Sequence, residues 1–292
     1  MEGKSPERLQ EWKDGTRMTL DELQELSRQI RIDVIKSVGT AKSGHVGGSV
    51  SCAEILATLY FSAMKADPAL PPEARDKCVL SKGHAAPALY SVLAHRGYFP
   101  REELLTLRKL GSRFQGHPDM KKTPGVDAST GSLGQGISIA VGLALGARLH
   151  KSQQKIFAIV GDGEAQEGQF WEAMMSAVHY KLANLTVIMD NNGLQIDGTN
   201  EQVMSLGDIR AKALAFGFEV IEVDGHDIPQ LLNAYAVKTQ GPKFILAHTV
   251  KGKGISFMEN QVGWHGKAPN AEEMEKALAE LDGQKSLAAV GA

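Results

Sequence analysis

The sequence predicts an α/β fold, a doubly wound and mostly parallel sheet with helices on both faces. Residues 156–160 are five consecutive apolar residues that Gly161 ends, which is typical of a strand buried on both sides. Residues 169–180 then carry apolar side chains at helical spacing, and residues 185–189 form a second apolar run. Apolar runs and helical patterns go on alternating after this unit, as expected for helices that cross over a parallel sheet.

The elements before this central unit follow in order. The charged residues 1–18 are expected to form a solvated leader, and a capping box, Thr19-Leu20-Asp21-Glu22, starts a helix that Gly39 ends. Further predicted elements are a helix over 53–64, a short strand over 78–80, a helix starting near 81–86, a helix from 100 to 111 and a helix over 137–149.

After the central unit, strands are predicted over 218–223 and 243–249, with a helix over 228–239 between them. Residues 271–282 have an amphipathic helical pattern, and residues 283–292 are rich in small residues and are expected to form a tail. No repeat or convincing boundary divides the chain, so residues 19–282 are predicted to be one domain.

Composition excludes several classes of partner. The chain has 292 residues, of which 42% are hydrophobic and 23% charged, with a formal charge of −2. Without a basic run, nothing favours nucleic acid or an anionic membrane as a partner. No apolar stretch is long enough to span a membrane and the N-terminus has no signal-peptide core, so the cytoplasm is expected. Cys52 and Cys78 are isolated and are interpreted as packed thiols.

Polar residues follow the two central strands at the point where each ends. Asp162 stands in Gly161-Asp162-Gly163 after the first strand, and Asn192 follows the second. Ligands of open parallel sheets bind at the carboxyl ends of the strands, so these side chains are expected to lie together. Their oxygens suit magnesium or calcium, and so few ligands imply that a phosphorylated cofactor completes the site. The alternative is that both segments are simple turns, which Gly, Asp and Asn also favour.

Four of the nine histidines, each beside glycine in a loop at the end of an element, are candidate functional residues. They are His45, His84, His117 and His265. Near a phosphate and a divalent ion, such side chains could donate hydrogen bonds or transfer protons near neutral pH. A zinc cage is the competing interpretation, and it is weaker because no HxxxH or HxH pair is present.

The segment GDG followed by NN resembles the thiamine diphosphate motif, and eight segments between residues 30 and 269 resemble transketolases in order and spacing. They are KSGHVGGS, LSKGHAAPALY, GHP, TGSLGQG, GDGEAQEGQFWEA, DNNGLQIDG, DGHD and WHGKAP. The resemblance covers the N-terminal, diphosphate-binding domain of that family. It implies the thiamine diphosphate-binding fold and the N-terminal subunit of a split transketolase, with a separate C-terminal subunit in an α2β2 heterotetramer.

The resemblance also implies roles for individual residues. The metal, Mg²⁺ or else Ca²⁺ or Mn²⁺, would be bound by Asp162, Asn192 and the carbonyl of Leu194. Thiamine diphosphate would be held by the side chains of Asp162 and Asn192, together with His84, Gly131, Leu133, Gly163 and His265. The catalytic group would consist of His45, His84, His117 and His265, with Glu167 linking two cofactor sites across an interface.

The implied reaction is transfer of a two-carbon ketol unit between sugars or sugar phosphates, and the chain is expected to be inactive without its partner. Two departures from the family pattern, Ser132 and Trp264, put the identity of the sugar in doubt, since Trp264 could narrow or reshape the channel. Two other functions stay open: the α subunit of a thiamine-dependent 2-oxo acid dehydrogenase, and a non-catalytic regulatory subunit that binds the cofactor.

Overall fold

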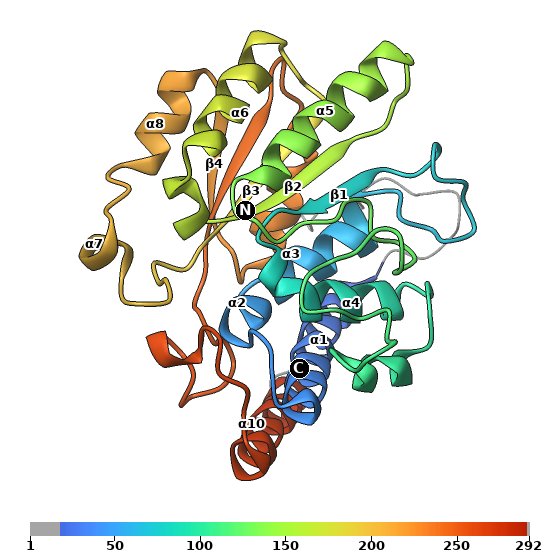
Figure 1. Ribbon diagram of the computed structural model, residues 1–292, viewed down its shortest axis with the longest axis vertical. Coiled ribbons are helices and arrows are strands. Elements are labelled where there is room, and N and C mark those ends of the chain that lie inside the picture. The colour runs from blue at the N-terminus through green and yellow to red at the C-terminus, as the bar shows by residue number, and fades with distance from the viewer. Residues whose placement is uncertain (1–17, 291–292) are drawn as a thin grey trace, which may run out of the picture.

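The computed structural model describes residues 18–290, and its centre is a five-stranded parallel sheet (Figure 1). The strands are β1 Lys77–Leu80, β2 Ile156–Gly161, β3 Leu185–Asn191, β4 Glu219–Asp224 and β5 Lys243–His248. They lie in the order β1-β2-β3-β5-β4, and every pairing is parallel. The predicted doubly wound α/β fold is confirmed.

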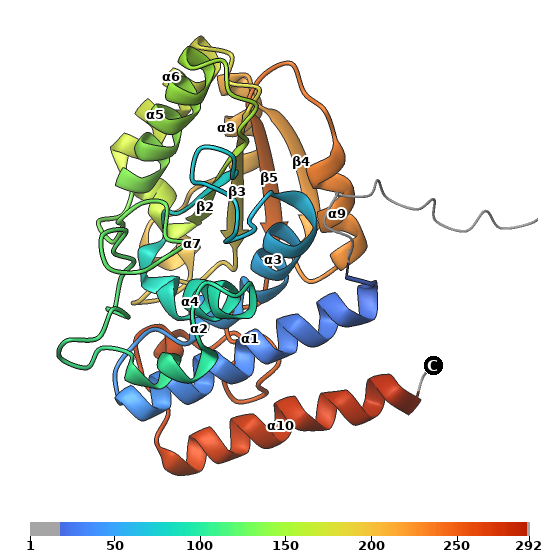
Figure 2. The ribbon, with the colours of Figure 1, turned by 90° about the vertical axis from the view of Figure 1, so that its right-hand side faces the viewer.

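Helices cover both faces of the sheet. They are α1 Leu20–Ala41, α2 Gly47–Val50, α3 Ala53–Thr58, α4 Ala86–His95, α5 Gln135–Leu149, α6 Gly168–His179, α7 Asn200–Val203, α8 Ile209–Phe216, α9 Ile228–Ala236 and α10 Ala271–Val290. α5, α6 and α8 share one hydrophobic core with the sheet, whereas α1, α3, α4 and α9 belong to the core on the other face. Figure 2 shows α10 lying along α1 on the outside of this second layer.

The alternation of side chains along each strand explains why the central strands are apolar throughout. In β2, Phe157 and Ile159 belong to the core with α1 and α3, and Ala158 and Val160 belong to the core with α5 and α6. Successive side chains of a strand point to opposite faces, so a sheet covered on both sides requires apolar residues at every position. All six residues of β2 are buried.

The predicted start of α1 is confirmed, but its predicted end is wrong. Thr19 and Glu22 form the expected capping box, in which the Glu22 amide donates to Thr19 Oγ1 at 3.2 Å. The helix continues past Gly39 to Ala41. A Cβ atom on Gly39 would come within 2.7 Å of Met274 Sδ on α10, so this glycine allows close packing between two helices and does not end one.

The helix predicted from 100 to 111 is only a short 3-10 helix, Arg101–Thr106. It ends because Leu107, with a ψ of 129°, is not helical and Arg108 has a φ of 58°, in the left-handed region. Further 3-10 helices cover Gly83–Ala85, Gly163–Gln166 and Val262–Trp264, and a π-helical turn, Leu59–Ala63, continues α3.

Other differences concern elements whose patterns are short or depend on packing. The prediction omitted α2, α7 and α8, and it extended α9 to residue 239 although that helix ends at Ala236. α10 runs to Val290, so much of the predicted tail over 283–292 is helical. The predicted leader lies almost entirely outside the described residues. Over residues 18–290, no helix combines the length and apolar character needed to cross a membrane.

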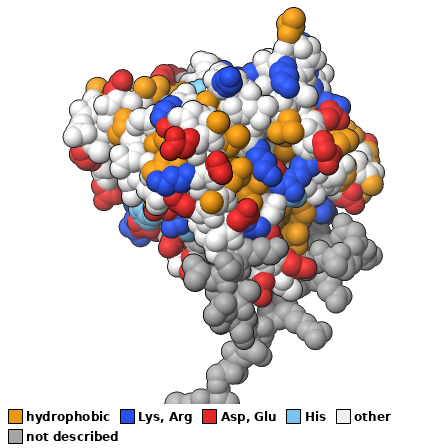
Figure 3. Space-filling model, turned by 90° about the horizontal axis from the view of Figure 1, so that it is seen from below, with side chains coloured by type: hydrophobic (Ala, Val, Ile, Leu, Met, Phe, Trp, Pro, Cys, Tyr) orange, Lys and Arg blue, Asp and Glu red, His pale blue; other side chains and the backbone are white. Residues whose placement is uncertain are grey.

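The surface seen from below in Figure 3 mixes acidic and basic side chains and shows no broad area of one charge. Some of the charges inside the molecule form ion pairs. The guanidinium of Arg31 on α1 donates to both carboxylate oxygens of Glu54 on α3 at 2.6 Å, and each side chain is at most 4% exposed. His226 Nδ1 lies 3.0 Å from the same carboxylate. This group ties α1 to α3 and to the loop after β4.

Replacing Glu54 by Ala is expected to lower the free energy of unfolding by about 3–5 kcal/mol, because it leaves the Arg31 guanidinium buried without its anion. Urea unfolding measures this change. The matched control is Glu273→Ala, which removes the exposed ion pair with Lys267 and is expected to cost at most about 1 kcal/mol. Equal losses in the two variants would contradict the assignment of Arg31–Glu54 as a buried structural pair.

Candidate functional site

The carboxyl ends of β2 and β3 meet at Asp162. Its carboxylate is 3% exposed and accepts hydrogen bonds from the Gly163 amide at 2.8 Å and from the Gly193 amide at 2.5 Å. The second of these bonds joins the segment after β2 to the turn after β3. The structure therefore brings Asp162 and the Asn192 turn together, as the order of the strands predicts.

This turn supplies further oxygen atoms. Asn192 Oδ1 accepts from the Leu194 amide at 3.2 Å, and the Leu194 carbonyl accepts from Lys251 Nζ at 3.0 Å. With Asp162, these residues offer a carboxylate, an amide oxygen and a backbone carbonyl, all of them hard ligands. Within residues 18–290, no group of three or more His, Cys, Asp or Glu side chains is placed to hold a metal ion. A cation here would thus rely on neutral oxygens and on ligands from a cofactor.

The charge of Asp162 also fits a cation. Burial raises the pKa of its carboxyl group above the ordinary value, and repulsion from Asp190 raises that pKa further. A divalent ion beside Asp162 would offset both effects, because it favours the ionised carboxylate. The residues at this site therefore suit magnesium and a diphosphate. The observation that supports this is the buried charge of Asp162, which is unfavourable without a cation beside it.

Sequence analysis did not single out Asp190, which is fully buried directly before Asn191. Its carboxylate accepts from Ser51 Oγ at 2.6 Å, from Thr249 Oγ1 and from the ammonium group of Lys82. Lys82 is also buried and donates to the Gly48 carbonyl at 2.6 Å. One ion pair thus links the end of β3 to the loop after β1 and to α2. The sequence signal that could have identified Asp190 is its position as a charged residue at the end of an apolar strand.

Glu164 is a second buried carboxylate that sequence analysis missed. It accepts from the Gly161 amide at 3.0 Å, from the Gly134 amide at 2.9 Å and from Ser81 Oγ. Burial raises the pKa of this carboxyl group. Its bonds join the end of β2 to the long small-residue loop before α5, so this loop is held in place by a side chain from the neighbouring strand end.

Gly131 and Leu133 lie in that loop, and the chain passes closely between other segments there. A Cβ atom on Gly83 would come within 2.8 Å of the Gly131 amide nitrogen, and one on Gly131 would lie 3.1 Å from the ring of His117. Leu133 is half-buried. The two glycines thus bring the loop against the segments that carry His84 and His117.

The four histidines converge from separate parts of the chain. The ring of His45 lies 5.4 Å from that of His84, 6.1 Å from that of His117 and 5.5 Å from that of His265, centroid to centroid. The rings of His84 and His265 are 5.1 Å apart. His45 precedes α2, His84 lies in the 3-10 helix between β1 and α4, His117 lies in the loop before α5, and His265 follows the last 3-10 helix.

The imidazoles in this cluster are neutral near pH 7. Burial, with the charges of Arg108, His117 and Lys251, lowers the pKa of His45 to about 4. Burial and the charge of Lys251 lower the pKa of His265 to about 3. Burial likewise lowers the pKa values of His84 and His117.

Lys251 connects the histidines to the oxygen site. Its side chain is buried, and Nζ lies 2.8 Å from His265 Nδ1 and 3.0 Å from the Leu194 carbonyl. Burial lowers the pKa of this ammonium group to about 8. Lys251 therefore stays mostly protonated at pH 7 and donates to both groups.

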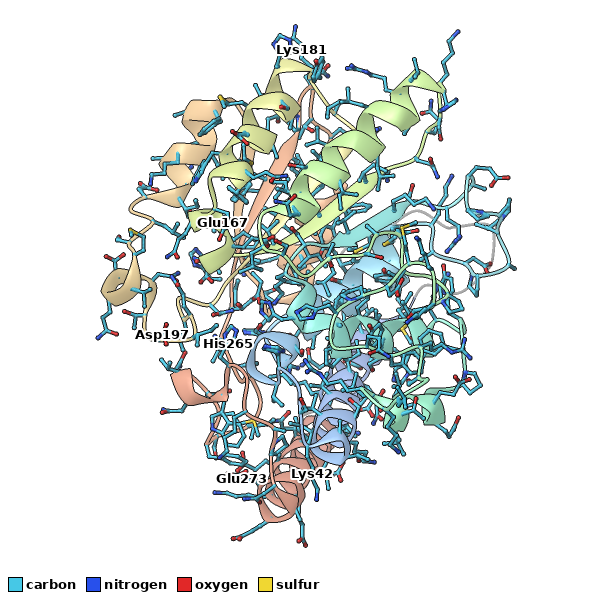
Figure 4. All side chains as sticks on the ribbon, in the orientation of Figure 1. Lys42, Glu167, Lys181, Asp197, His265 and Glu273 are labelled. Carbon is cyan, nitrogen blue, oxygen red and sulfur yellow. The ribbon has the colours of Figure 1, made fainter. Side chains whose placement is uncertain are left out.

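Two further residues named in the sequence analysis are Glu167 and Trp264. Glu167 is exposed at the start of α6, and Figure 4 shows it apart from His265 in that view. Trp264 is 7% exposed, its Nε1 donates to the Phe257 carbonyl at 3.0 Å, and Lys267 Nζ lies 4.2 Å from the centre of its ring. The ring of Trp264 belongs to the core, and the expectation that this residue narrows or reshapes the substrate channel stays a prediction.

Comparison with known proteins gives the family. A family model described as the thiamine diphosphate binding domain of transketolase matches residues 23–286. The chain belongs to the transketolase family. The predicted family and its cofactor-binding domain are therefore confirmed.

Several relatives of this transketolase-family chain are separate subunits of similar length. One subunit of an apulose-4-phosphate transketolase from Phocaeicola vulgatus is 40% identical over 268 residues, which cover 90% of this chain and 95% of that protein. One subunit of a 6-deoxy-6-sulfo-D-fructose transketolase from Clostridium sp. is 45% identical over 266 residues, or 89% and 96% of the two chains. The similarity to these proteins supports a split transketolase with a separate partner.

Single-chain transketolases match over less than half of their length. Transketolase from Homo sapiens is 39% identical over 269 residues, which cover 91% of this chain and 43% of that protein. The crystal structure of transketolase from Campylobacter jejuni matches with a TM-score of 0.85 and 33% identity, over 91% of this chain and 43% of that one. The shared fold is that of one part of the longer enzyme.

The depressed histidine pKa values predict how stability depends on pH. His45 and His265 have an ordinary pKa of 6.5 in the unfolded chain and values of about 4 and 3 in the folded one, so the unfolded chain binds more protons between these limits. Stability is expected to fall as the pH drops below about 6.5. Thermal unfolding at a series of pH values would show a weaker dependence in H45Q and H265Q than in the wild-type chain. An unchanged dependence would show that these histidines are not held neutral by the fold.

Proposed function

We propose that the chain is the cofactor-binding subunit of a split transketolase, which transfers a two-carbon ketol unit from a ketose donor to an aldose acceptor. The observation that carries this proposal is the convergence of four loop histidines, whose contacting rings have centroids 5.1–6.1 Å apart, beside the oxygen site at the ends of β2 and β3. Such a cluster can bind and deprotonate several hydroxyl groups of one sugar.

The residues that would hold the cofactor are those that line the strand ends. Asp162, Asn192 and the Leu194 carbonyl would bind magnesium, or calcium or manganese in its place. His84, His265 and the backbone of Gly131, Leu133 and Gly163 would contact thiamine diphosphate. When bound, this cofactor supplies the electron sink for breaking a carbon-carbon bond beside a carbonyl group.

The chain's own groups would move the protons. Protonated Lys251 donates to His265 Nδ1, so the neutral imidazole carries its proton on Nε2 and presents a donor to a sugar oxygen. His45 Nδ1 is buried, and no partner for it is found among the described residues. His45 would be a further partner for a substrate hydroxyl. His84 and His117, also neutral, would complete the set of donors and acceptors.

A second polypeptide is part of this proposal. The separate transketolase subunits found as relatives support it, and an α2β2 heterotetramer is the assembly we propose, with Glu167 facing another copy across an interface. The isolated chain would then be inactive. The named relatives act on apulose 4-phosphate and on 6-deoxy-6-sulfo-D-fructose, so we propose sugars or sugar phosphates as substrates of this chain. A place in the pentose phosphate pathway and a cytoplasmic location stay predictions.

The two competing functions differ in their support. The family assignment and the histidine cluster favour transketolase over the α subunit of a 2-oxo acid dehydrogenase. A regulatory subunit that only binds the cofactor would share the oxygen site, and activity of the reconstituted complex separates it from an enzyme.

Replacing Asp162 by Asn is expected to abolish the stabilisation that thiamine diphosphate with magnesium gives the reconstituted complex, because it removes the one carboxylate of the site. At a hundredfold the dissociation constant, a ligand adds about 2.7 kcal/mol of stability, which thermal unfolding detects. The control is Glu201→Gln, an exposed carboxylate on α7. Full cofactor stabilisation in D162N would remove Asp162 from the metal site.

Replacing His265 by Ala is expected to lower the turnover number of the reconstituted complex by roughly 10²–10⁴, the range for a general acid or base. Steady-state kinetics with a ketose donor and an aldose acceptor measure it. His179→Ala provides the control, since this histidine is exposed at the end of α6. The proposed role of His265 fails if H265A binds the cofactor and turns over at the wild-type rate.

A further inference from the structure

The side chain of Arg108 lies between the two loops that carry His45 and His117. Its Nη1 donates to Ser43 Oγ at 3.2 Å, two positions before His45. The guanidinium also lies against Gly116, where a Cβ atom would come within 2.5 Å of Nη2 and 2.6 Å of Cζ. One side chain therefore contacts both histidine loops, and Gly116 leaves the space that it occupies.

The backbone at Arg108 is held in an unfavourable conformation. Its φ of 58° lies in the left-handed region, which is unfavourable for a residue with a side chain. The Arg108 amide donates to the Phe114 carbonyl at 2.7 Å, and the ring of Phe114 is fully buried against Tyr90 and Phe99. The core thus closes this loop and directs the arginine side chain toward the histidines. Strain of this kind is often retained at functional sites.

The other side of the His117 loop is fixed as well. The Tyr90 hydroxyl lies 3.0 Å from the carbonyl oxygens of both Gln115 and His117. The backbone of Gly131 lies below the imidazole of His117. The His117 loop is therefore held by Tyr90 and Gly131 on one side and contacted by Arg108 on the other.

The charge of Arg108 acts on both rings. Within the described part of the chain, no carboxylate forms an ion pair with Arg108, and its Nε is buried without a hydrogen-bond partner. His45 faces the rings of the other three cluster histidines and the charges of Arg108 and Lys251. His117 faces His45 and Arg108. After burial, the charge of Arg108 is the next largest cause that lowers the pKa of His45 and of His117.

We propose that Arg108 is a positioning residue, whose guanidinium joins the His45 loop to the His117 loop and places a positive charge beside both imidazoles. Neutral rings can accept protons from sugar hydroxyls, whereas imidazolium ions cannot. This inference rests on the proposed function for its catalytic consequence. The effect of Arg108 on the two rings does not depend on it.

The test is a titration of histidine side chains by NMR on the full chain. His45 and His117 are assigned from the signals lost in H45Q and H117Q. In R108Q, both pKa values are expected to rise by about 1 unit, because a nearby positive charge has been removed. R108K keeps the charge and is expected to shift them less than R108Q does.

Two variants make the result interpretable. Arg113 lies on the same loop but packs over Phe99 and Phe114 and pairs with Glu103, so R113Q is expected to leave both histidines unchanged. R108G removes the guanidinium and tolerates the left-handed backbone, which keeps the test available if R108Q unfolds. Unchanged pKa values of His45 and His117 in a folded R108Q or R108G chain would overturn the inference.

Kinetics of the reconstituted complex give the second measurement. In R108Q, the acidic limb of the pH profile of kcat/KM is expected to move to higher pH by about the same 1 unit, and R113Q is expected to keep the wild-type profile. An acidic limb that stays in place would show that Arg108 has no part in the reaction. If no variant or wild-type complex transfers a ketol unit, the proposed function fails, and the NMR titration still decides the effect of Arg108 on the histidines.

Discussion

The buried ion pair between Asp190 and Lys82 holds the segments of the site together. It lies at the carboxyl end of β3, where four side chains from separate segments reach one carboxylate. Removing either partner would leave a charge in the interior, which is far more costly than losing an exposed pair. Because Lys82 also bonds to Gly48, the same pair fixes the segments that present His45 and His84.

Around this ion pair, the oxygen atoms and the imidazoles of the site lie on different segments. The ends of β2 and β3 collect oxygen atoms, and the charge of Asp162 among them is disfavoured by burial and by Asp190. The loops opposite collect imidazoles, which burial and the nearby cations Arg108 and Lys251 keep neutral. Lys251 contacts both parts, so the proton on His265 and the carbonyl of Leu194 depend on one ammonium group.

Most of the fold and much of the site could be predicted from the sequence. The apolar runs of β2 and β3 and the polar residues after them indicate a parallel sheet and its ligand edge, because burial on both faces demands such runs. The prediction of a helix from 100 to 111 was wrong because the end of this helix depends on a hydrogen bond from the Arg108 amide to the Phe114 carbonyl. That bond forms only when Phe114 packs into the core. The roles of Glu164 and Lys82 were not predicted, because the groups to which they bond are distant in the chain.

Periodicity and motifs are local properties of the chain, and they were enough to establish the α/β fold, the family and the residue types that could bind a cofactor. Which charges are buried, and what faces them, followed instead from contacts between distant segments. Such contacts made Trp264 a core residue and Arg108 a neighbour of two histidines. They arise from packing, and packing sets both the pKa values and the geometry of the site.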